Sequence, residues 1–98
     1  MKIKDIPWYN RPGVRLKRNG VENLSDAELF SILLTRGNKK ENALDLSNRI
    51  LKKYNFTGLN KLPFEKLEKE TKDQVKAMKI LVLFELHKRI NNLFEGKI

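Results

Sequence analysis

The sequence predicts an all-α fold, a compact bundle of about five helices. Apolar residues recur at intervals of three to four along most of the 98 residues, which is the period of an amphipathic helix. Alternation with a period of two, typical of a half-buried strand, extends no further than MKIKDI at the start. We expect a single domain over residues 1–95, followed by a frayed tail at 96–98.

Local signals place the first three helices. Pro12 suits a first helical turn and Gly20 suits a helix end, so the first helix is expected over about 12–19. Ser25 and Glu28 form the capping box of a second helix, which we expect to end at Gly37. The third helix is expected over 41–54, with Asn55 as its stop.

The last helix, expected over about 72–94, is the most apolar segment, and it follows short turns after Thr57 and Pro63. A helix that is apolar over so much of its circumference is expected to be central, with the shorter helices around it. If Leu83 or Phe94 is exposed instead, this helix offers a surface for a homodimer or a protein partner. Its main stripe consists of Val75, Met78, Val82, Leu86, Ile90 and Leu93.

The charge is clustered. The chain carries 21 basic and 12 acidic residues, a net charge of +9. Residues 1–20 carry six basic residues and one acid, and residues 36–53 carry six and two. Such clusters favour a polyanionic partner, most commonly nucleic acid, although a host with a lysine-rich and asparagine-rich proteome gives a similar total.

Several classes of protein are disfavoured by what the sequence does not contain. It has no cysteine, so disulfides and thiolate metal sites are excluded. Its longest apolar run, Ile80 to Phe84, is far shorter than the about 20 residues of a membrane span, and no signal region opens the chain. We expect a cytoplasmic protein without membrane contact. His87 is the single histidine, so we expect it to be a packing or surface residue in a chain without catalysis, cofactor or metal.

The segment RPGVRLKRNGVENLSDAELFSILLTRGNKKENALDLSNRIL resembles the amino-terminal domain of the RadC (UPF0758) family. A looser similarity through FEKLEKE extends the resemblance over about residues 1–92. It implies an all-α helix–hairpin–helix domain of the SAM-like type, which binds the DNA backbone and has a historical label in DNA repair. In full-length members a JAB/MPN metallopeptidase-like domain follows, whose metal motif is absent from this sequence. The resemblance rests on Arg11-Pro12, Leu16, Gly20, the run Leu24 to Leu29, Ile32, Leu33, Gly37 and Leu44-Asp45-Leu46.

The resemblance also implies a Gly-x-Gly hairpin before the last helix, and this chain departs from it. The corresponding residues in KETKDQVKAMKI are Thr71, Lys72 and Asp73, and Lys76 matches a lysine common in the family. Glycines at such a turn let backbone N–H groups approach a phosphate closely. Thr71 and Asp73 each carry a Cβ, and Asp73 adds a negative charge, so both changes oppose that contact.

The replacement residues suggest a plain helix start. Thr71 followed by Gln74 reads as a second capping box, so we expect the last helix to begin without a hairpin turn. In the alternative interpretation Lys72, Lys76 and Lys79, spaced at i, i+4 and i+7, lie near one face and contact phosphate electrostatically.

Two further basic groups are candidates for phosphate contact. Arg36, Lys39 and Lys40 lie between the second and third helices, in a segment that resembles a DNA-contacting loop of helix–hairpin–helix glycosylases. The alternative is a helix end with basic residues at the negative end of the helix dipole. The auxiliary patch consists of Arg11, Arg15 and Arg18.

Aromatic and acidic residues allow further interpretations. Trp8 and Tyr9 are suited to stacking on an unpaired base, but an aromatic pair beside a proline more often pins an N-terminal arm onto the core. We interpret Glu65, Glu68 and Glu70 as a solvated face and not a metal site.

Three functions remain. The leading one is a non-catalytic DNA-binding module that contacts phosphates through Lys and Arg, independently of base sequence. The alternative is a protein–protein interaction or positioning domain that has lost its hairpin contact with DNA. The third is the remnant of a helix–hairpin–helix DNA glycosylase, for which Asp73 is the only acid near the required place.

Overall fold

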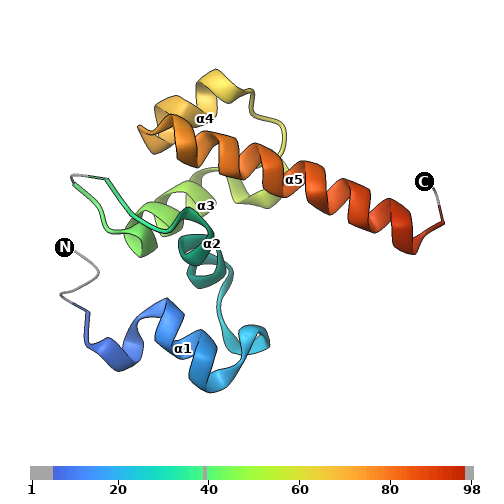
Figure 1. Ribbon diagram of the computed structural model, residues 1–98. Coiled ribbons are helices and arrows are strands. Elements are labelled where there is room, and N and C mark those ends of the chain that lie inside the picture. Colours follow the sequence, from blue (N-terminus) through green and yellow to red (C-terminus); the bar gives the residue numbers. More distant parts are fainter. Residues whose placement is uncertain (1–5, 39, 97–98) are drawn as a thin grey trace. The chain divides into compact units, whose positions relative to one another are not determined.

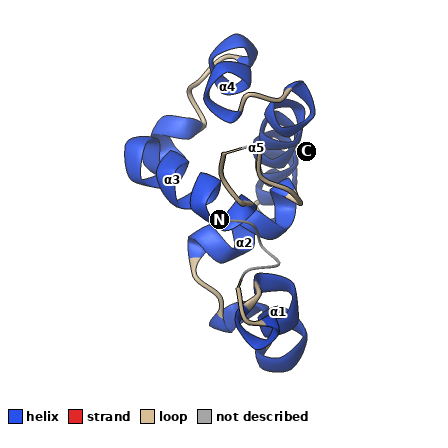
Figure 2. Ribbon diagram, turned by 90° about the vertical axis from the view of Figure 1, so that its left-hand side faces the viewer, coloured by secondary structure: helices blue, strands red, loops and turns tan. Residues whose placement is uncertain are grey.

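The computed structural model describes residues 6–38 and 40–96. Within these ranges the regular structure is helical, with five α-helices and two short 3-10 helices joined by loops (Figure 2). The predicted all-α class is therefore confirmed. Two compact units divide between Phe56 and Thr57, and we call them unit 1 and unit 2. That residues 1–95 act as a single domain stays a prediction, and residues 97–98 of the expected tail lie outside the described ranges.

Unit 1 opens with two short elements packed on a helix. The 3-10 helix η2 covers Trp8–Asn10, helix α1 covers Pro12–Asn19, and the 3-10 helix η3 covers Val21–Asn23. Pro12 lies at the start of α1, and Gly20 ends it at a φ of 88°, where a residue without a Cβ is favoured. The predicted bounds of this helix are confirmed.

Helix α2 covers Asp26–Leu34, and the predicted capping box at its start is present. The Ser25 Oγ accepts from the Glu28 amide at 3.2 Å, and the Ser25 amide donates to Glu28 Oε1 at 3.0 Å. The expected end at Gly37 is wrong. The helix stops at Leu34 because Thr35 adopts a φ of 73° and its amide closes the last turn onto Ser31.

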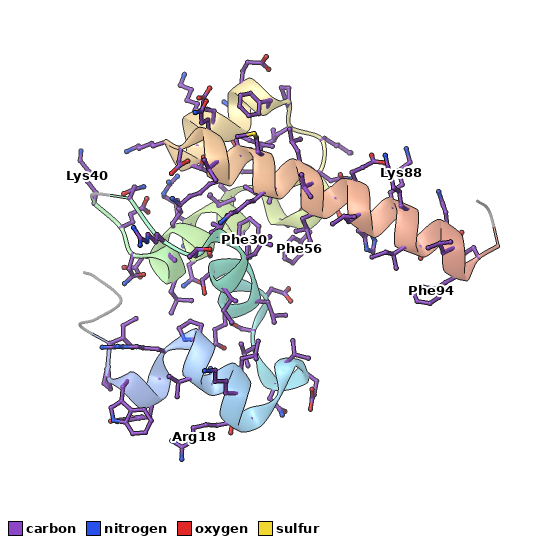
Figure 3. The ribbon with its side chains drawn as sticks, in the orientation of Figure 1. Arg18, Phe30, Lys40, Phe56, Lys88 and Phe94 are labelled. Atoms are coloured by element: carbon purple, nitrogen blue, oxygen red, sulfur yellow. The ribbon has the colours of Figure 1, made fainter. Side chains whose placement is uncertain are left out.

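Helix α3 covers Ala43–Leu59 and contains the predicted stop as a break. Asn55 has a φ of 49° and a ψ of 178°, which no α-helix accommodates, and helical geometry resumes after it. Phe30 and Phe56 meet edge to face in unit 1, with ring centroids 6.1 Å apart (Figure 3). The buried apolar side chains of this unit are Leu24, Phe30, Leu34, Ala43, Leu46 and Ile50.

Unit 2 is built around two helices that pack on each other. Helix α4 covers Phe64–Thr71 and helix α5 covers Gln74–Phe94, and α4 lies along the first half of α5 (Figure 1). The buried apolar side chains of this unit are Leu59, Leu67, Ala77 and Ile80. Within the described ranges no helix combines the length and the apolar character that a membrane crossing requires.

The expectation that the last helix is central, with the shorter helices around it, is not met within unit 2. The six side chains of its apolar stripe are between 46% and 55% exposed, and only Lys76, Ala77 and Ile80 of α5 are buried. A helix of eight residues is about 12 Å long and one of 21 residues about 31 Å, so α4 does not cover α5 from end to end. Phe94 is 85% exposed, which meets the condition set for a partner surface.

Candidate nucleic-acid interface

The loop between α2 and α3 presents basic side chains, and its described residues, 35–38 and 40–42, make close backbone contacts with one another. Gly37 approaches the next turn so closely that a Cβ on it would lie 1.9 Å from the Glu41 carbonyl oxygen. The Asn38 amide donates to the same oxygen at 2.9 Å. A glycine is therefore required at position 37 for packing, although its φ is not in the left-handed region.

Side chains complete this loop. Asn38 Oδ1 accepts from the amides of Lys40 and Glu41 at 2.9 and 3.0 Å, which is an Asx turn. Arg49 binds the Glu41 carboxylate through Nε and Nη2, at 2.8 and 3.0 Å. These contacts link the loop to α3, and they pair the charge of Arg49 with that of Glu41.

Arg36 and Lys40 are exposed in this loop, and the side chain of Lys40 points away from it (Figure 3). Lys39, the third basic residue expected here, lies outside the described residues. Two of the three predicted cations thus stand in solvent on a backbone held by the contacts above. This arrangement suits contact with a phosphate, which needs a cation that reaches water.

The three arginines expected as an auxiliary patch are engaged in unit 1. Arg11 Nε donates to the Ile6 carbonyl at 3.0 Å. Arg15 forms an ion pair with Glu28. The Arg18 guanidinium lies over the ring of Trp8, 5.6 Å from its centroid, and is exposed. Of the three, Arg18 has the side chain best placed to reach a ligand.

Glu28 belongs to both the capping box and the ion pair. Its burial raises the pKa of the carboxyl, but hydrogen bonds from the Ser25 amide and from Arg15 lower it by more. The pKa of Glu28 therefore lies below its ordinary value of 4.5. Arg15 is thus a structural partner of α2, which the spacing of the three arginines did not reveal.

The aromatic pair beside Pro7 does not pin the chain onto the core, and that expectation is wrong. Trp8 is 59% exposed and Tyr9 is 52% exposed. Their rings meet edge to face, with centroids 5.8 Å apart. The pair lies on a short 3-10 helix, which turns both rings toward solvent.

The predicted phosphate-binding segment forms a tight hairpin between α4 and α5. Helix α4 ends at Thr71, Lys72 adopts the left-handed conformation with φ 60° and ψ 29°, and α5 follows after Asp73. The expected start without a hairpin turn is therefore wrong. Thr71 Oγ1 lies 2.9 Å from the carbonyl oxygens of both Leu67 and Asp73, so it ties the end of α4 to the turn.

The N-cap of α5 is Asp73, and the expected capping box of Thr71 and Gln74 is wrong. Asp73 Oδ1 accepts from the amides of Val75 and Lys76 at 2.7 and 3.3 Å. Its Oδ2 accepts from Lys76 Nζ at 3.0 Å, and this bond contributes most to a lowered pKa of Asp73. A carboxylate thus occupies the amides that a phosphate would need.

The three lysines of this segment differ in their surroundings. Lys72 precedes α5 and is exposed, Lys76 is buried in its ion pair with Asp73, and Lys79 is half-buried. Lys72 is the lysine that the hairpin presents to solvent. Phosphate contact by Lys76 and Lys79 stays a prediction.

The remaining predictions concern His87, the glutamates of α4 and the expected lack of a metal site. His87 is exposed on α5, consistent with a surface residue. Glu65 is exposed, but Glu70 is 9% exposed and buried, so the expected solvated face of three glutamates is wrong in part. Among the described residues no group of three or more His, Asp or Glu is arranged to hold a metal ion.

Comparison with known proteins gives one consistent family. A family profile described as UPF0758 N-terminal matches residues 3–80. UPF0758 protein YsxA of Bacillus subtilis is 42% identical over 97 residues, which are 95% of this chain and 41% of that protein. UPF0758 protein Mbar_A2303 of Methanosarcina barkeri is 38% identical over 97% of this chain and 42% of its own length. UPF0758 protein CA_C1241 of Clostridium acetobutylicum is 45% identical over 91% and 40%.

The chain therefore spans about two fifths of the length of the curated relatives that it matches. No solved structure matches it.

Proposed function

Because the chain belongs to the UPF0758 family, through the N-terminal domain of its members, we propose that it is a non-catalytic DNA-binding module. It contacts phosphates through Lys and Arg side chains and does not discriminate between base sequences. The observation that carries the proposal is the exposure of Arg36 and Lys40, which lie on either side of Asn38, whose side chain accepts hydrogen bonds from the amides of Lys40 and Glu41. A cytoplasmic location and a role in DNA repair belong to the same proposal.

The hairpin of unit 2 supports this proposal through its geometry. Helices α4 and α5 are joined by a two-residue turn with Lys72 at its tip, and we interpret them as a helix–hairpin–helix motif. Asp73 fills the amides at the start of α5. The hairpin therefore contributes the Lys72 ammonium to phosphate binding. Its backbone N–H groups at Val75 and Lys76 already donate to Asp73.

The test is a fluorescence-anisotropy titration of a labelled duplex between about 50 and 200 mM salt. The variant Arg36→Ala/Lys40→Ala removes two proposed phosphate contacts and is expected to lower the salt slope by about 2. The control is Lys52→Ala/Lys53→Ala, which removes the same charge from α3. Equal losses in both variants would mean diffuse charge only, and a loss confined to certain base sequences would contradict the backbone mechanism.

A second function is favoured by the apolar stripe of α5. Monomeric proteins seldom expose a continuous row of large apolar side chains, and such rows mark protein interfaces. We propose that a second copy of this chain, or another protein, covers this stripe. The six residues of the stripe span 18 positions from Val75 to Leu93 in five steps, which matches the 3.6 residues of a helical turn, so the stripe stays on one side of a nearly straight helix.

Sedimentation equilibrium over a range of protein concentrations tests this second function. Val82→Lys and Leu86→Lys place charges on the stripe, and they are expected to leave a monomer where the unmodified chain associates. Lys88→Glu on exposed α5 surface serves as the control. If the mass of the unmodified chain does not depend on concentration, the proposal that a second copy covers the stripe is contradicted, whatever the variants do.

A further inference from the structure

The exposed aromatic pair of unit 1 has a chemistry that the proposed function does not use. Trp8 and Tyr9 are each more than half exposed. Large aromatic side chains are normally buried or placed at a site of contact, because their apolar area is costly to leave in water. The pair is therefore the most prominent candidate site outside the phosphate contacts.

The backbone that carries the two rings is held by hydrogen bonds. The amides of Asn10 and Arg11 close the turns of η2 onto Pro7 and Trp8, at 2.8 and 3.3 Å. Arg11 Nε anchors the preceding segment through the Ile6 carbonyl. Helix α1 follows directly at Pro12 and packs against η2. Both rings thus extend from a backbone segment that these contacts already hold in place.

A cation already occupies part of the Trp8 ring. The Arg18 guanidinium lies 5.6 Å from the ring centroid, within cation–π distance. The side chain of Arg18 extends from the surface of α1, as Figure 3 shows. With 59% of Trp8 in contact with solvent, the ring keeps area for a second flat group.

Charge restricts what that group is. Residues 1–20 carry six basic residues and one acid, and Lys17 and Arg18 of α1 are exposed. A ligand that combines flat rings with regularly spaced negative charges is a nucleic acid. In a duplex the faces of the bases are covered by their neighbours, so an indole stacks only on a base that is unpaired.

We infer that Trp8, Tyr9 and Arg18 form a stacking site for an unpaired base of single-stranded nucleic acid. The indole of Trp8 takes the base, Tyr9 supports the ring edge to face, and Arg18 and Lys17 hold the neighbouring phosphates. This inference rests on the proposed function, and it gives the module a preference for DNA with unpaired bases.

The chain contains one tryptophan, so its indole emission reports on position 8 alone. The full chain is titrated with oligothymidylate and with a blunt duplex of equal length, at one salt concentration. Indole emission and the anisotropy of a label on the DNA are recorded together. Single strands are expected to quench Trp8, and the duplex is expected to bind without quenching.

Variants separate stacking from charge. Trp8→Ala is expected to weaken single-strand binding at least about fivefold and to leave duplex binding unchanged. Trp8→Phe, which keeps an aromatic face, is expected to restore part of the loss. Val21→Ala, which truncates another exposed apolar side chain of unit 1, is the matched control and is expected to change neither affinity.

The outcomes distinguish this inference from the function on which it rests. Single-strand binding without quenching, or an equal loss of both DNA types in Trp8→Ala, overturns the stacking site alone. Duplex binding in that case leaves the phosphate-binding module intact. Failure of both DNA types to bind overturns the proposed function and the stacking site together.

Discussion

The Asp73 carboxylate lies 3.0 Å from the Lys76 ammonium and also accepts hydrogen bonds from the amides of Val75 and Lys76. One side chain thus caps α5 and neutralises a lysine whose side chain is only 8% exposed. Lys76 corresponds to a lysine that is common in the last helix of the family. In this chain the Lys76 charge is paired with Asp73 within the hairpin. The same carboxylate lies at the N-terminus of α5, the positive end of the helix dipole.

The cap and the ion pair are expected to stabilise the fold measurably. Asp73→Ala removes both, and we expect it to lower the free energy of unfolding by at least about 1 kcal/mol. Asp73→Asn keeps a side-chain acceptor and should lose less. Gln74→Ala, which would break the capping box expected from the sequence, should cost almost nothing. Urea unfolding gives the midpoints, and equal costs for Gln74→Ala and Asp73→Ala would contradict the assignment of the cap.

The same carboxylate is expected to weaken DNA binding. Asp73→Asn removes a negative charge beside the exposed Lys72 and breaks the ion pair with Lys76, while its side-chain oxygen can still cap α5. We therefore expect a higher affinity for duplex DNA at low salt, measured by anisotropy. Glu65→Gln removes one charge from the exposed surface of α4 and controls for net charge. If it raises the affinity as much as Asp73→Asn does, the position of the charge is irrelevant.

Glu28 is expected to give the fold a dependence on pH. Its pKa is lower in the folded chain than the ordinary 4.5, so the ionised carboxylate stabilises the fold above that pH. This contribution is lost as the pH falls from about 5 through the folded pKa. Glu28→Gln should cost about 1–3 kcal/mol at neutral pH and much less in acid.

Urea unfolding at neutral pH and at acid pH measures this difference. The control is Asp26→Asn, which changes an exposed acid in the first turn of the same helix. A cost for Glu28→Gln that stays constant across the pH range would show that its ionisation does not contribute.

The loop 35–42 is expected to tolerate no side chain at Gly37. Gly37→Ala places a Cβ 1.9 Å from a backbone oxygen, so the loop must move, at a cost of about 1–3 kcal/mol or more. Gly13→Ala meets no atom within 4 Å and lies in α1, where alanine is favoured by up to about 1 kcal/mol. Thermal unfolding should show a lower midpoint for Gly37→Ala and a higher midpoint for Gly13→Ala than for the unmodified chain. If the loop carries the DNA contact, Gly37→Ala also weakens DNA binding.

The parts of the fold that local chemistry decides could be predicted from the sequence. Ser25 and Glu28 are three residues apart and satisfy each other's backbone, so the start of α2 needs no information from elsewhere. Pro12 and Gly20 likewise define α1 through their own backbone preferences. The helical class and most of the helix starts follow from such pairs.

The candidate site was harder to predict because it depends on competition between two possible N-cap residues and on tertiary packing. Thr71 and Asp73 are both good caps, and the pattern favoured Thr71. In the structure its hydroxyl contacts Leu67 at the end of α4, and Asp73 takes the role. The exposure of Trp8 and of the α5 stripe depends on which surfaces meet in three dimensions, and periodicity does not encode it.

Lys72 holds a left-handed backbone, with a φ of 60°, at the tip of the hairpin. Glycine adopts this conformation without steric cost, whereas a residue with a Cβ loses about 1 kcal/mol there. Folding and charge therefore make opposite demands at this position. A glycine would give the sturdier hairpin, and lysine gives the one with a cation at its tip. The left-handed backbone of Lys72 is thus the cost of placing a cation at the tip of the hairpin.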